Sequence, residues 1–356
     1  MRRLRESLKP ETRKFLLDDF GYDLPEDLIA AVPLARREAS RMLCVDRTLG
    51  EVGDGLFSTF PSHLRAGDVL VLNNTKVFPA RLNGKTETGA NIELLLQEEV
   101  GHNVWTALAK PARRLKPGKI LDLGSGIECE VVERDEGSVH IKFGDSVDVW
   151  SAADRIGSTP LPHYIQRPQG ETASDRERYQ TIFAKERGAI AAPTAGLHFS
   201  EQILNEIRAN GVKVVEITLH VGYGTFEPVR VDDLTRHTVL PERYEVSEET
   251  VATLNESHQL GGRVVAVGTT TTRVLETIVN EDGTFAAGKG GASLTIIPGF
   301  RFKAIDALLT NFHLPKSSLL ILVSTFTGHE LIMKAYRRAV TSRYRFYSYG
   351  DCMFIQ

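Results

Sequence analysis

Short apolar runs, each broken after a few residues by Gly, Asn, Asp or Lys-Pro, fill the chain between residues 67 and 143. Short strands at such even spacing, with little helical periodicity between them, are typical of a small β-barrel or sandwich. We therefore predict a β-barrel domain over residues 65–149. Its strands are expected at residues 67–73, 77–84, 91–97, 103–110, 119–123, 127–134 and 138–143.

The pattern changes after about residue 150, where apolar strands alternate with loops and amphipathic helices. The clearest helix is predicted to follow Ser200, a residue type that caps helix N-termini, and to end near Gly211. Three apolar residues recur on one face of this helix, as the helical period requires: Ile203, Leu204 and Ile207.

Further strands are predicted at residues 189–193, 212–221, 263–267 and 306–310. Each runs into a polar loop, and most of these loops lead into a helix. Repeated strand–loop–helix units imply a parallel or mixed sheet with flanking helices. We expect an α/β domain made of residues 1–64 and 150–356, with the β-barrel domain inserted between these two segments.

The amino-acid composition indicates the broad class of protein. The chain has 356 residues, of which 42% are hydrophobic and 25% charged, as in an ordinary globular protein with about two domains. No stretch approaches the roughly 18 consecutive apolar residues of a membrane span, and the basic N-terminal segment lacks the apolar core of a signal peptide. We expect a cytoplasmic protein without a membrane segment.

The three cysteines, Cys44, Cys129 and Cys352, are far apart in the sequence and form no C-x-x-C pair. This spacing argues against a disulfide framework and against a structural zinc site.

The net charge of −3 gives the whole molecule no attraction for phosphate, but two segments are locally basic. Residues 110–119 contain several cations and no acid, and residues 331–350 interleave cations with aromatic side chains. Unpaired RNA bases stack on aromatic rings, so the second segment favours RNA as a partner over a merely solvated helix face.

Polar residues collect where the predicted α/β strands end. In open α/β sheets the ligand crevice lies beyond the carboxyl ends of the strands, so several loops are expected to meet at one site. A single histidine after a strand is commonly structural, but histidines at successive strand ends indicate that at least one of them acts in the site. The residues concerned are Thr194, His198, His220, Tyr223, Thr225, Thr269–Thr272, Asn311 and His313.

Familiar cofactor and hydrolase motifs are absent from the sequence. There is no Walker loop, no G-x-G-x-x-G after a strand, no H-E-x-x-H and no G-x-S-x-G. His198, His220 and His313 have no carboxylate at fixed spacing in their loops, so we expect no metal. From the residues alone we expect a metal-free enzyme with histidine acid–base groups in an α/β crevice, and RNA is a candidate substrate.

Two further stretches contain candidate binding groups. The threonine run at 269–272 precedes a helix and can direct N–H groups and hydroxyls at an anion, or can simply cap the helix. Arg273 and Glu276 lie one helical turn apart and can pair with each other. The amides of Asn73 and Asn74, followed by Thr75 and Arg81, form either a turn or a group that contacts a base edge and a phosphate or carboxylate.

The motifs taken together resemble the S-adenosylmethionine:tRNA ribosyltransferase-isomerase family of the queuosine pathway. The resemblance runs from about residue 20 to residue 353 and preserves the order of the motifs. They are "FGYDLPEDLIA", "VLNNTKVFPARL", "STPLPHYI", "DRERYQTIFA", "AAPTAGLHF", "HVGYGTF", "VGTTTTR", "PGFRFKAIDALLTNFHLP" and "YRFYSYGDCM".

The resemblance implies a β-barrel domain beside an α/β domain, together with a specific reaction. The ribosyl part of S-adenosylmethionine moves to the aminomethyl group of 7-aminomethyl-7-deazaguanine at the tRNA wobble position. Adenine and methionine are released, and the isomerised sugar becomes the epoxycyclopentanediol of epoxyqueuosine. The implied partner is the tRNA anticodon loop, and we expect a monomer. S-adenosylmethionine is consumed as a substrate, so no cofactor is expected.

The implied chemistry gives the candidate residues roles. The sulfonium acidifies the adjacent ribose methylene, so a neutral imidazole is a suitable base. We expect His198 or His220 to be this base, and the other histidine, Glu276 or Asp306 to protonate the departing adenine.

The remaining candidates are expected to bind the substrates. Thr269, Thr270 and Arg273 would hold the methionine carboxylate or the sugar hydroxyls, and Asn311 and His313 would line the same pocket. Arg345, Tyr349 and Asp351 would meet the modified base or its flanking phosphates. The other expected binding residues are Asn73, Asn74, Thr75, Arg81, Thr194 and Thr225.

The chain departs from the family pattern at a few positions. Where the family reads H-x-M-H-x-E, this chain has "HTVLPE", so His237 and Glu242 remain while Leu240 replaces the second histidine, which argues against an obligatory role for that position. His163 replaces a proline, Lys76 an arginine and Cys352 an alanine. None of these changes removes a group that has been given a main role.

Two interpretations from other classes remain. A non-catalytic RNA-binding protein would bind tRNA without any small molecule. A methyltransferase that uses the same donor would release S-adenosylhomocysteine where the ribosyltransferase releases adenine, and the absence of a G-x-G-x-x-G loop argues against it.

Overall fold

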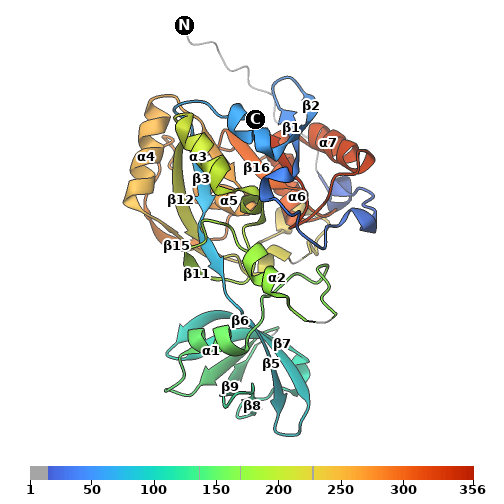
Figure 1. Cartoon of the computed structure of the whole chain (residues 1–356), viewed down its shortest axis with the longest axis vertical. Helices are drawn as coiled ribbons and strands as arrows, with labels where there is room; N and C mark the ends of the chain where they lie inside the picture. Colours follow the sequence, from blue (N-terminus) through green and yellow to red (C-terminus); the bar gives the residue numbers. More distant parts are fainter. Residues whose placement is uncertain (1–14, 136, 169, 227) are drawn as a thin grey trace.

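The computed structural model describes residues 15–135, 137–168, 170–226 and 228–356, with the side chains of Arg114, Thr225 and Phe226 excepted. The basic N-terminal arm therefore lies outside the described residues. Figure 1 shows a sheet covered by helices in the upper part of the molecule and a separate small barrel below it.

The upper part is built on a mixed sheet of nine strands in the order β15-β13-β12-β3-β14-β16-β17-β1-β2. The four central strands, β12, β3, β14 and β16, are parallel, so their carboxyl ends share one edge. The strands are β1 (Arg41–Asp46), β2 (Glu51–Leu56), β3 (Val69–Asn73), β12 (Lys213–Leu219), β13 (Glu242–Val246), β14 (Val264–Val267), β15 (Gly288–Ala292), β16 (Ala307–Asn311) and β17 (Cys352–Ile355).

Helices cover both faces of this sheet. They are α3 (Glu201–Ala209), α4 (Glu248–Gln259), α5 (Thr269–Ile278), α6 (Ser318–Thr327) and α7 (His329–Thr341). Side chains of α4 to α7 pack on one face, and α3 packs on the other beside the 3-10 helix Phe57–His63. No helix of the described residues is long and apolar enough to cross a membrane.

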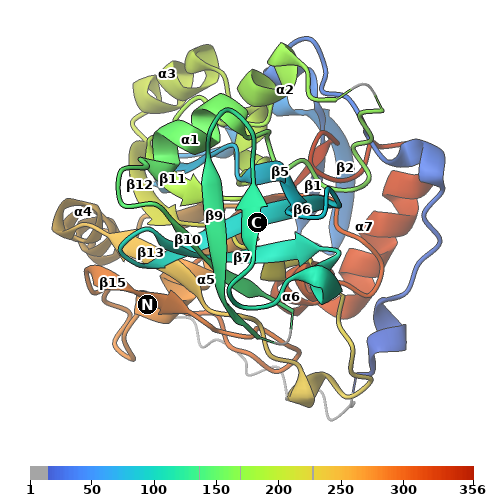
Figure 2. The same ribbon diagram turned by 90° about the horizontal axis from the view of Figure 1, so that it is seen from below.

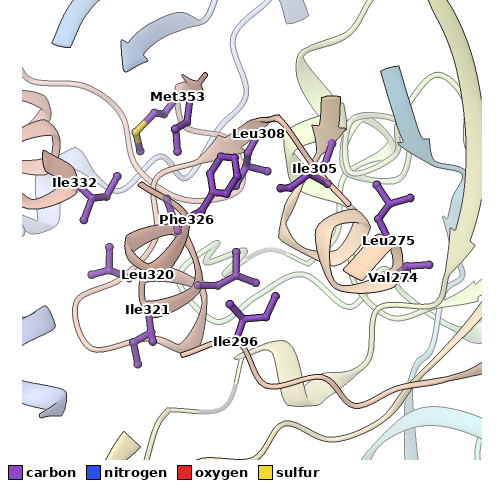
Figure 3. Close-up of a cluster of buried hydrophobic side chains, with 14 of the residues drawn as sticks. Val274, Leu275, Ile296, Ile305, Leu308, Leu320, Ile321, Phe326, Ile332 and Met353 are labelled. Carbon is purple, nitrogen blue, oxygen red and sulfur yellow. The ribbon is translucent and has the colours of Figure 1, made fainter. Parts of the chain in front are cut away.

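The two-sided cover explains the unbroken apolar runs of the central strands. In β14, Val264 and Ala266 belong to the core under α4 to α7, whereas Val265 and Val267 belong to the core under α3. A strand buried on both faces has no polar alternation. Figure 3 shows part of the first core, where Leu275 of α5 and Leu320 and Phe326 of α6 lie around the sheet residue Leu308.

The lower part is a closed antiparallel barrel in the order β10-β7-β6-β5-β8-β9 (Figure 2). Its strands are β5 (Arg81–Thr86), β6 (Asn91–Gly101), β7 (Val104–Lys110), β8 (Ile120–Asp122), β9 (Glu128–Arg134) and β10 (Val139–Phe143). The helix α1 (Val149–Ile156) contributes Val149, Ala152 and Ala153 to the barrel core. The predicted fold class, a mixed sheet with flanking helices beside a small β-barrel, is confirmed.

Two strands differ from the prediction. Residues 190–193, expected in a strand, lie beyond the end of β11 (Glu186–Ala189) and lead into the 3-10 helix Thr194–His198. Residues 69–73, which we expected in the barrel, form β3 at the centre of the nine-stranded sheet, between β12 and β14. All five residues are buried, which suits a central strand of a covered sheet better than a barrel strand with one solvent face. The barrel core begins only at Phe78. The division of the chain into domains at residues 64 and 149 remains a prediction.

Short elements connect the two parts. β4 (Thr75–Val77) pairs in parallel with β11 (Glu186–Ala189), immediately before the chain enters the barrel at β5. The helix α2 (Ala173–Arg178) lies between the barrel and the sheet in Figure 1. The predicted helix after Ser200 is confirmed as α3, and the Ser200 hydroxyl accepts a hydrogen bond from the Ile203 N–H.

Candidate functional site

A cavity of about 170 Å³ lies beyond the carboxyl ends of β14 and β16. Most of its lining comes from four chain segments: residues 192–195, the start of α5 at 268–270, the loop 310–319, and residues 347–348; Val221 and Pro228 complete it. The predicted residues that line it are Thr194, Thr269, Thr270, Asn311 and His313. These side chains, distant in the sequence, therefore share one site.

The N-terminus of α5 opens onto this cavity. Gly268 precedes the helix with φ +91°, and no side chain caps the first turn. The first N–H groups of a helix have no partner within it and carry a partial positive charge. This end of α5 is therefore suited to hold an anionic group of a ligand.

The four threonines at this helix end divide into two pairs. Thr271 and Thr272 donate their hydroxyls to the carbonyl oxygens of Val267 (2.7 Å) and Gly268 (3.1 Å), one turn back along the chain. The hydroxyls of Thr269 and Thr270 have no hydrogen-bond partner within the described part of the chain, and both residues line the cavity. Helix structure accounts for the first pair, and the second pair is available to a ligand.

His198 does not line this cavity, although it supports a residue that does. It is 3% exposed, its Nε2 lies 2.9 Å from Oδ1 of Asn311, and its Nδ1 lies 2.8 Å from Oγ of Ser40. The Asn311 amide donates from Nδ2 to the carbonyl oxygens of Tyr347 (2.9 Å) and Ser348 (3.3 Å).

These partners fix the tautomer of His198. The carboxamide oxygen of Asn311 can only accept, so Nε2 carries the proton and Nδ1 accepts from the Ser40 hydroxyl. Burial lowers the pKa of His198 to about 4, which keeps the ring neutral at pH 7. Both nitrogens are occupied, so the contacts favour His198 as a positioning residue for Asn311 over a base that touches the substrate.

His313 is the imidazole that lines the cavity. Its backbone N–H donates to the Tyr336 hydroxyl (2.9 Å), and its carbonyl accepts from the Tyr22 hydroxyl (2.5 Å). Its ring contacts are long, at 3.3 Å from Nε2 to Thr310 Oγ1 and 3.4 Å from Nδ1 to Tyr336. Burial lowers the pKa of His313 to about 3, so the ring is neutral at pH 7. The backbone is held firmly while the ring retains hydrogen-bonding capacity.

His220 lies outside the residues that line the cavity. Its Nδ1 lies 2.8 Å from the Thr75 hydroxyl, and its ring lies against Gly188, where a Cβ would approach the ring to 2.7 Å. Burial, together with the positive charge of Arg243, lowers the pKa of His220 to about 4. These contacts place His220 and Thr75 where β4, β11 and the end of β12 meet.

Asn73 and Asn74 join β3 to β12. The Asn73 amide exchanges two hydrogen bonds with the backbone of Leu219, donating to its carbonyl and accepting from its N–H at 3.0 Å each. The Asn74 amide donates to Glu216 (3.1 Å) and accepts from the Thr218 hydroxyl (2.7 Å). Both amides are satisfied by the protein, which accounts for this pair without a nucleic-acid base.

Arg273 and Glu276 do not pair with each other. Arg273 forms a buried ion pair with Glu242, and burial lowers the pKa of the guanidinium to about 10. Glu276 accepts three backbone N–H bonds from residues 303–305, at 3.0, 3.0 and 3.3 Å. Burial raises the pKa of Glu276. Neither residue lines the cavity, and Glu276 anchors the segment that leads into β16.

The other predicted residues also lie apart from the main cavity. Arg81, at the first residue of β5, donates to the Leu161 carbonyl (3.1 Å). Asp351 accepts from the N–H groups of Arg41 (2.9 Å) and Arg345 (2.8 Å), and burial raises its pKa. Tyr349 lines a smaller cavity beside His198. The side chain of Thr225 lies outside the described residues.

Among the lining residues that the sequence does not single out, two have an unusual backbone conformation. Tyr347 and Lys316 both line the cavity, and both have positive φ, at 74° and 58°. Such a backbone is uncommon for residues other than glycine and is often found at functional sites. The Tyr347 ring lies 4.1 Å, between centroids, from that of Tyr164. The motif "YRFYSYGD" marked the neighbourhood of Tyr347 but gave no sign of this conformation.

Histidines do not converge on a metal. Within the described residues, no group of three or more His, Cys, Asp or Glu side chains is placed to hold a metal ion. His198, His220 and His313 each contact hydroxyl or amide groups instead.

We expect the protein to lose stability as the pH falls from about 7 to about 4, in part through His198. An unfolded histidine binds a proton near pH 6.5, whereas folded His198, with a pKa of about 4, resists protonation. The unfolded state then binds more protons, so the free energy of unfolding decreases as the pH falls. Urea midpoints of His198→Gln, which keeps an N–H donor without titrating, should depend less on pH between 6.5 and 4. An unchanged pH dependence would contradict the assignment.

The comparisons with known proteins agree with this picture. Residues 17–355 match the family described as "Queuosine biosynthesis protein". Proteins named S-adenosylmethionine:tRNA ribosyltransferase-isomerase from Citrifermentans bemidjiense and Syntrophotalea carbinolica are each 48% identical over 342 residues, covering 95% of this chain and 99% of the relative.

A solved structure is also similar. The crystal structure of S-adenosylmethionine tRNA ribosyltransferase from Thermotoga maritima is 36% identical, with a TM-score of 0.54, and the alignment covers 95% of this chain and 100% of that one. The family match spans the sheet, the barrel and every segment that lines the cavity. The chain belongs to the S-adenosylmethionine:tRNA ribosyltransferase-isomerase family of queuosine biosynthesis.

Proposed function

We propose that this chain transfers and isomerises the ribosyl part of S-adenosylmethionine onto the aminomethyl group of 7-aminomethyl-7-deazaguanine at the tRNA wobble position. The reaction releases adenine and methionine and forms epoxyqueuosine. Membership of the family over residues 17–355 carries the proposal. The cavity beside α5 supports it, because its polar groups suit a small molecule with an anionic end. We expect the protein to act as a cytoplasmic monomer.

The donor is proposed to occupy the cavity with its methionine carboxylate at the N-terminus of α5. The unpaired N–H groups of the first turn and the hydroxyls of Thr269 and Thr270 would bind this carboxylate. Pro193, Phe312 and Leu314 line the same cavity and would contact the apolar parts of the donor. Arg273 would contribute indirectly, since its ion pair with Glu242 stabilises the helix that carries these threonines.

The proton chemistry is proposed to centre on His313 and the Asn311 amide. The sulfonium acidifies the adjacent ribose methylene, and His313 is unprotonated at pH 7 because burial lowers its pKa to about 3. It can therefore accept a hydrogen bond from the substrate, and proton abstraction by this ring requires that its pKa rise toward 7 when the donor is bound. Asn311, oriented by His198, would hold a sugar hydroxyl or the base. His220 is a second candidate for the base, and this role requires that its ring reach the donor in the complex.

Product analysis tests the proposed function directly. Purified protein incubated with S-adenosylmethionine and tRNA that carries the aminomethyl-deazaguanine should release adenine and methionine. The tRNA should gain the epoxycyclopentanediol adduct. Mass spectrometry of the small molecules and the digested nucleosides measures both products. Unchanged tRNA with retained binding would support an RNA-binding protein, and S-adenosylhomocysteine would identify a methyltransferase; either result contradicts the proposal.

A matched pair of threonine variants tests the position of the donor. Thr270→Val removes a hydroxyl that is free to bind the donor, and we expect it to raise the KM for S-adenosylmethionine about 10-fold, the effect of losing one hydrogen bond to a charged group. Thr272→Val is the control, because its hydroxyl bonds only the Gly268 carbonyl. Equal KM values for the two variants would show that the carboxylate does not lie at this helix end.

A further inference from the structure

A second, smaller cavity of about 20 Å³ adjoins the main one. Ser348 lines both cavities, so the two are neighbours. Arg37, Arg178, His198 and Tyr349 contribute to the lining of the smaller one. Its volume admits one or two oxygen atoms, and it cannot hold a nucleoside or an amino acid.

The two arginines of this cavity act on each other electrostatically, and Glu177 compensates the charge of Arg37 only in part. The Arg37 guanidinium donates to the carbonyl oxygens of Leu197 (3.1 Å) and Glu177 (3.2 Å), and that of Arg178 donates to the carbonyls of residues 34 and 35 (2.7 and 3.2 Å). Asp175 and Glu171 pair with Arg167 and Arg176, and within the described ranges Arg37 and Arg178 form no ion pair. Backbone carbonyls satisfy individual N–H groups but leave two positive charges side by side.

Buried polar atoms at this cavity also lack partners. The Tyr349 hydroxyl, in a residue that is 5% exposed, and Nε of Arg178 are both buried without a hydrogen bond in the described structure. Nη1 of Arg345 is a third such atom, and the charges of Arg37 and Arg345 both act on His198. Buried donors without an acceptor are unfavourable, so an acceptor from outside the protein is expected here.

We propose that this cavity receives the non-bridging oxygens of one phosphodiester group of the RNA substrate, an inference that rests on the proposed function. Arg37, Arg178 and the Tyr349 hydroxyl supply donors and positive charge, as an oxyanion requires. The donor's carboxylate already has a place at the N-terminus of α5. Ser348, shared by both cavities, sets the phosphate beside the nucleotide that receives the ribosyl group. Arg178 ends α2, the helix between the barrel and the sheet (Figure 1).

Two variants test this site. The probe is an anticodon stem–loop RNA that carries the aminomethyl-deazaguanine, and its Kd is measured over a range of salt concentrations. Arg178→Gln should weaken binding about 10-fold and reduce the slope of log K against log salt by about 0.7 to 1, as for one lost phosphate contact. Tyr349→Phe should weaken binding several-fold without a change in slope.

The controls separate binding from folding. Tyr349→Phe should leave the thermal midpoint unchanged or raised, because its hydroxyl has no partner in the described structure. Arg208→Gln makes the same charge change as Arg178→Gln on the exposed side of α3, where the Arg208 guanidinium donates to Asn205 of the same helix. It should leave RNA affinity and salt slope as in the wild type.

Three outcomes would overturn the proposal. Unchanged RNA affinity and slope in both variants would mean that the cavity holds only water. A higher KM for S-adenosylmethionine with unchanged RNA binding would assign the cavity to the donor's carboxylate. In the third outcome, inorganic phosphate stabilises the wild type but not Arg178→Gln, while both proteins bind RNA equally well. That result would assign the cavity to a free anion. These outcomes can be distinguished from failure of the proposed function. If the proposed function is wrong, the wild type releases no adenine, whereas the phosphate site is tested by RNA affinity.

Discussion

The hydrogen-bond chain from Ser40 through His198 to Asn311 is the interaction on which the site depends. Asn311 is the last residue of β16, and its amide binds the backbone of residues 347 and 348, which also line the cavity. His198 fixes the orientation of that amide because it donates to the amide oxygen. The Ser40 hydroxyl completes the chain, because it donates to the remaining ring nitrogen of the tautomer that Asn311 fixes. Three segments distant in the sequence are thereby held in register around the cavity.

The neutral state of the imidazoles follows from the same packing. His198 and His313 are both enclosed by apolar side chains and hydroxyl groups, and burial lowers the pKa of each far below 7. A protonated His198 would direct a second N–H at Ser40 and place a charge near Arg37 and Arg345. Positive charge near the cavities is instead carried by the arginines and by the α5 N-terminus, and these are the groups that can meet carboxylate and phosphate.

The sequence was sufficient for the architecture wherever a local signal decides the structure. Hydrophobic period and a capping residue predict α3 and its Ser200 cap. Turn residues predict most of the barrel strands, and strand ends predict the crevice residues that follow β14 and β16. β3 was assigned to the wrong sheet because a short apolar run shows that a strand is buried but does not identify its neighbours.

Side-chain partners across the fold could not be predicted in the same way. Arg273 and Glu276 have the spacing of a helical pair, yet Glu242 and the backbone of residues 303–305 bind them instead. The Asn73 amide resembled a group for ligand contact and is used to join two strands. The positive φ of Tyr347 arises from the loop around it and leaves no mark in the residue type.

The central claim is that His198 acts through Asn311. The most direct measurement is kcat/KM for His198→Ala, Asn311→Ala and the double variant, with His198→Gln as the conservative substitution. If His198 only positions Asn311, the double variant is no slower than Asn311→Ala, and His198→Gln recovers most of the activity through its retained N–H donor. Multiplicative losses, with no recovery in His198→Gln, would show that the imidazole itself takes part in the chemistry and would contradict the account.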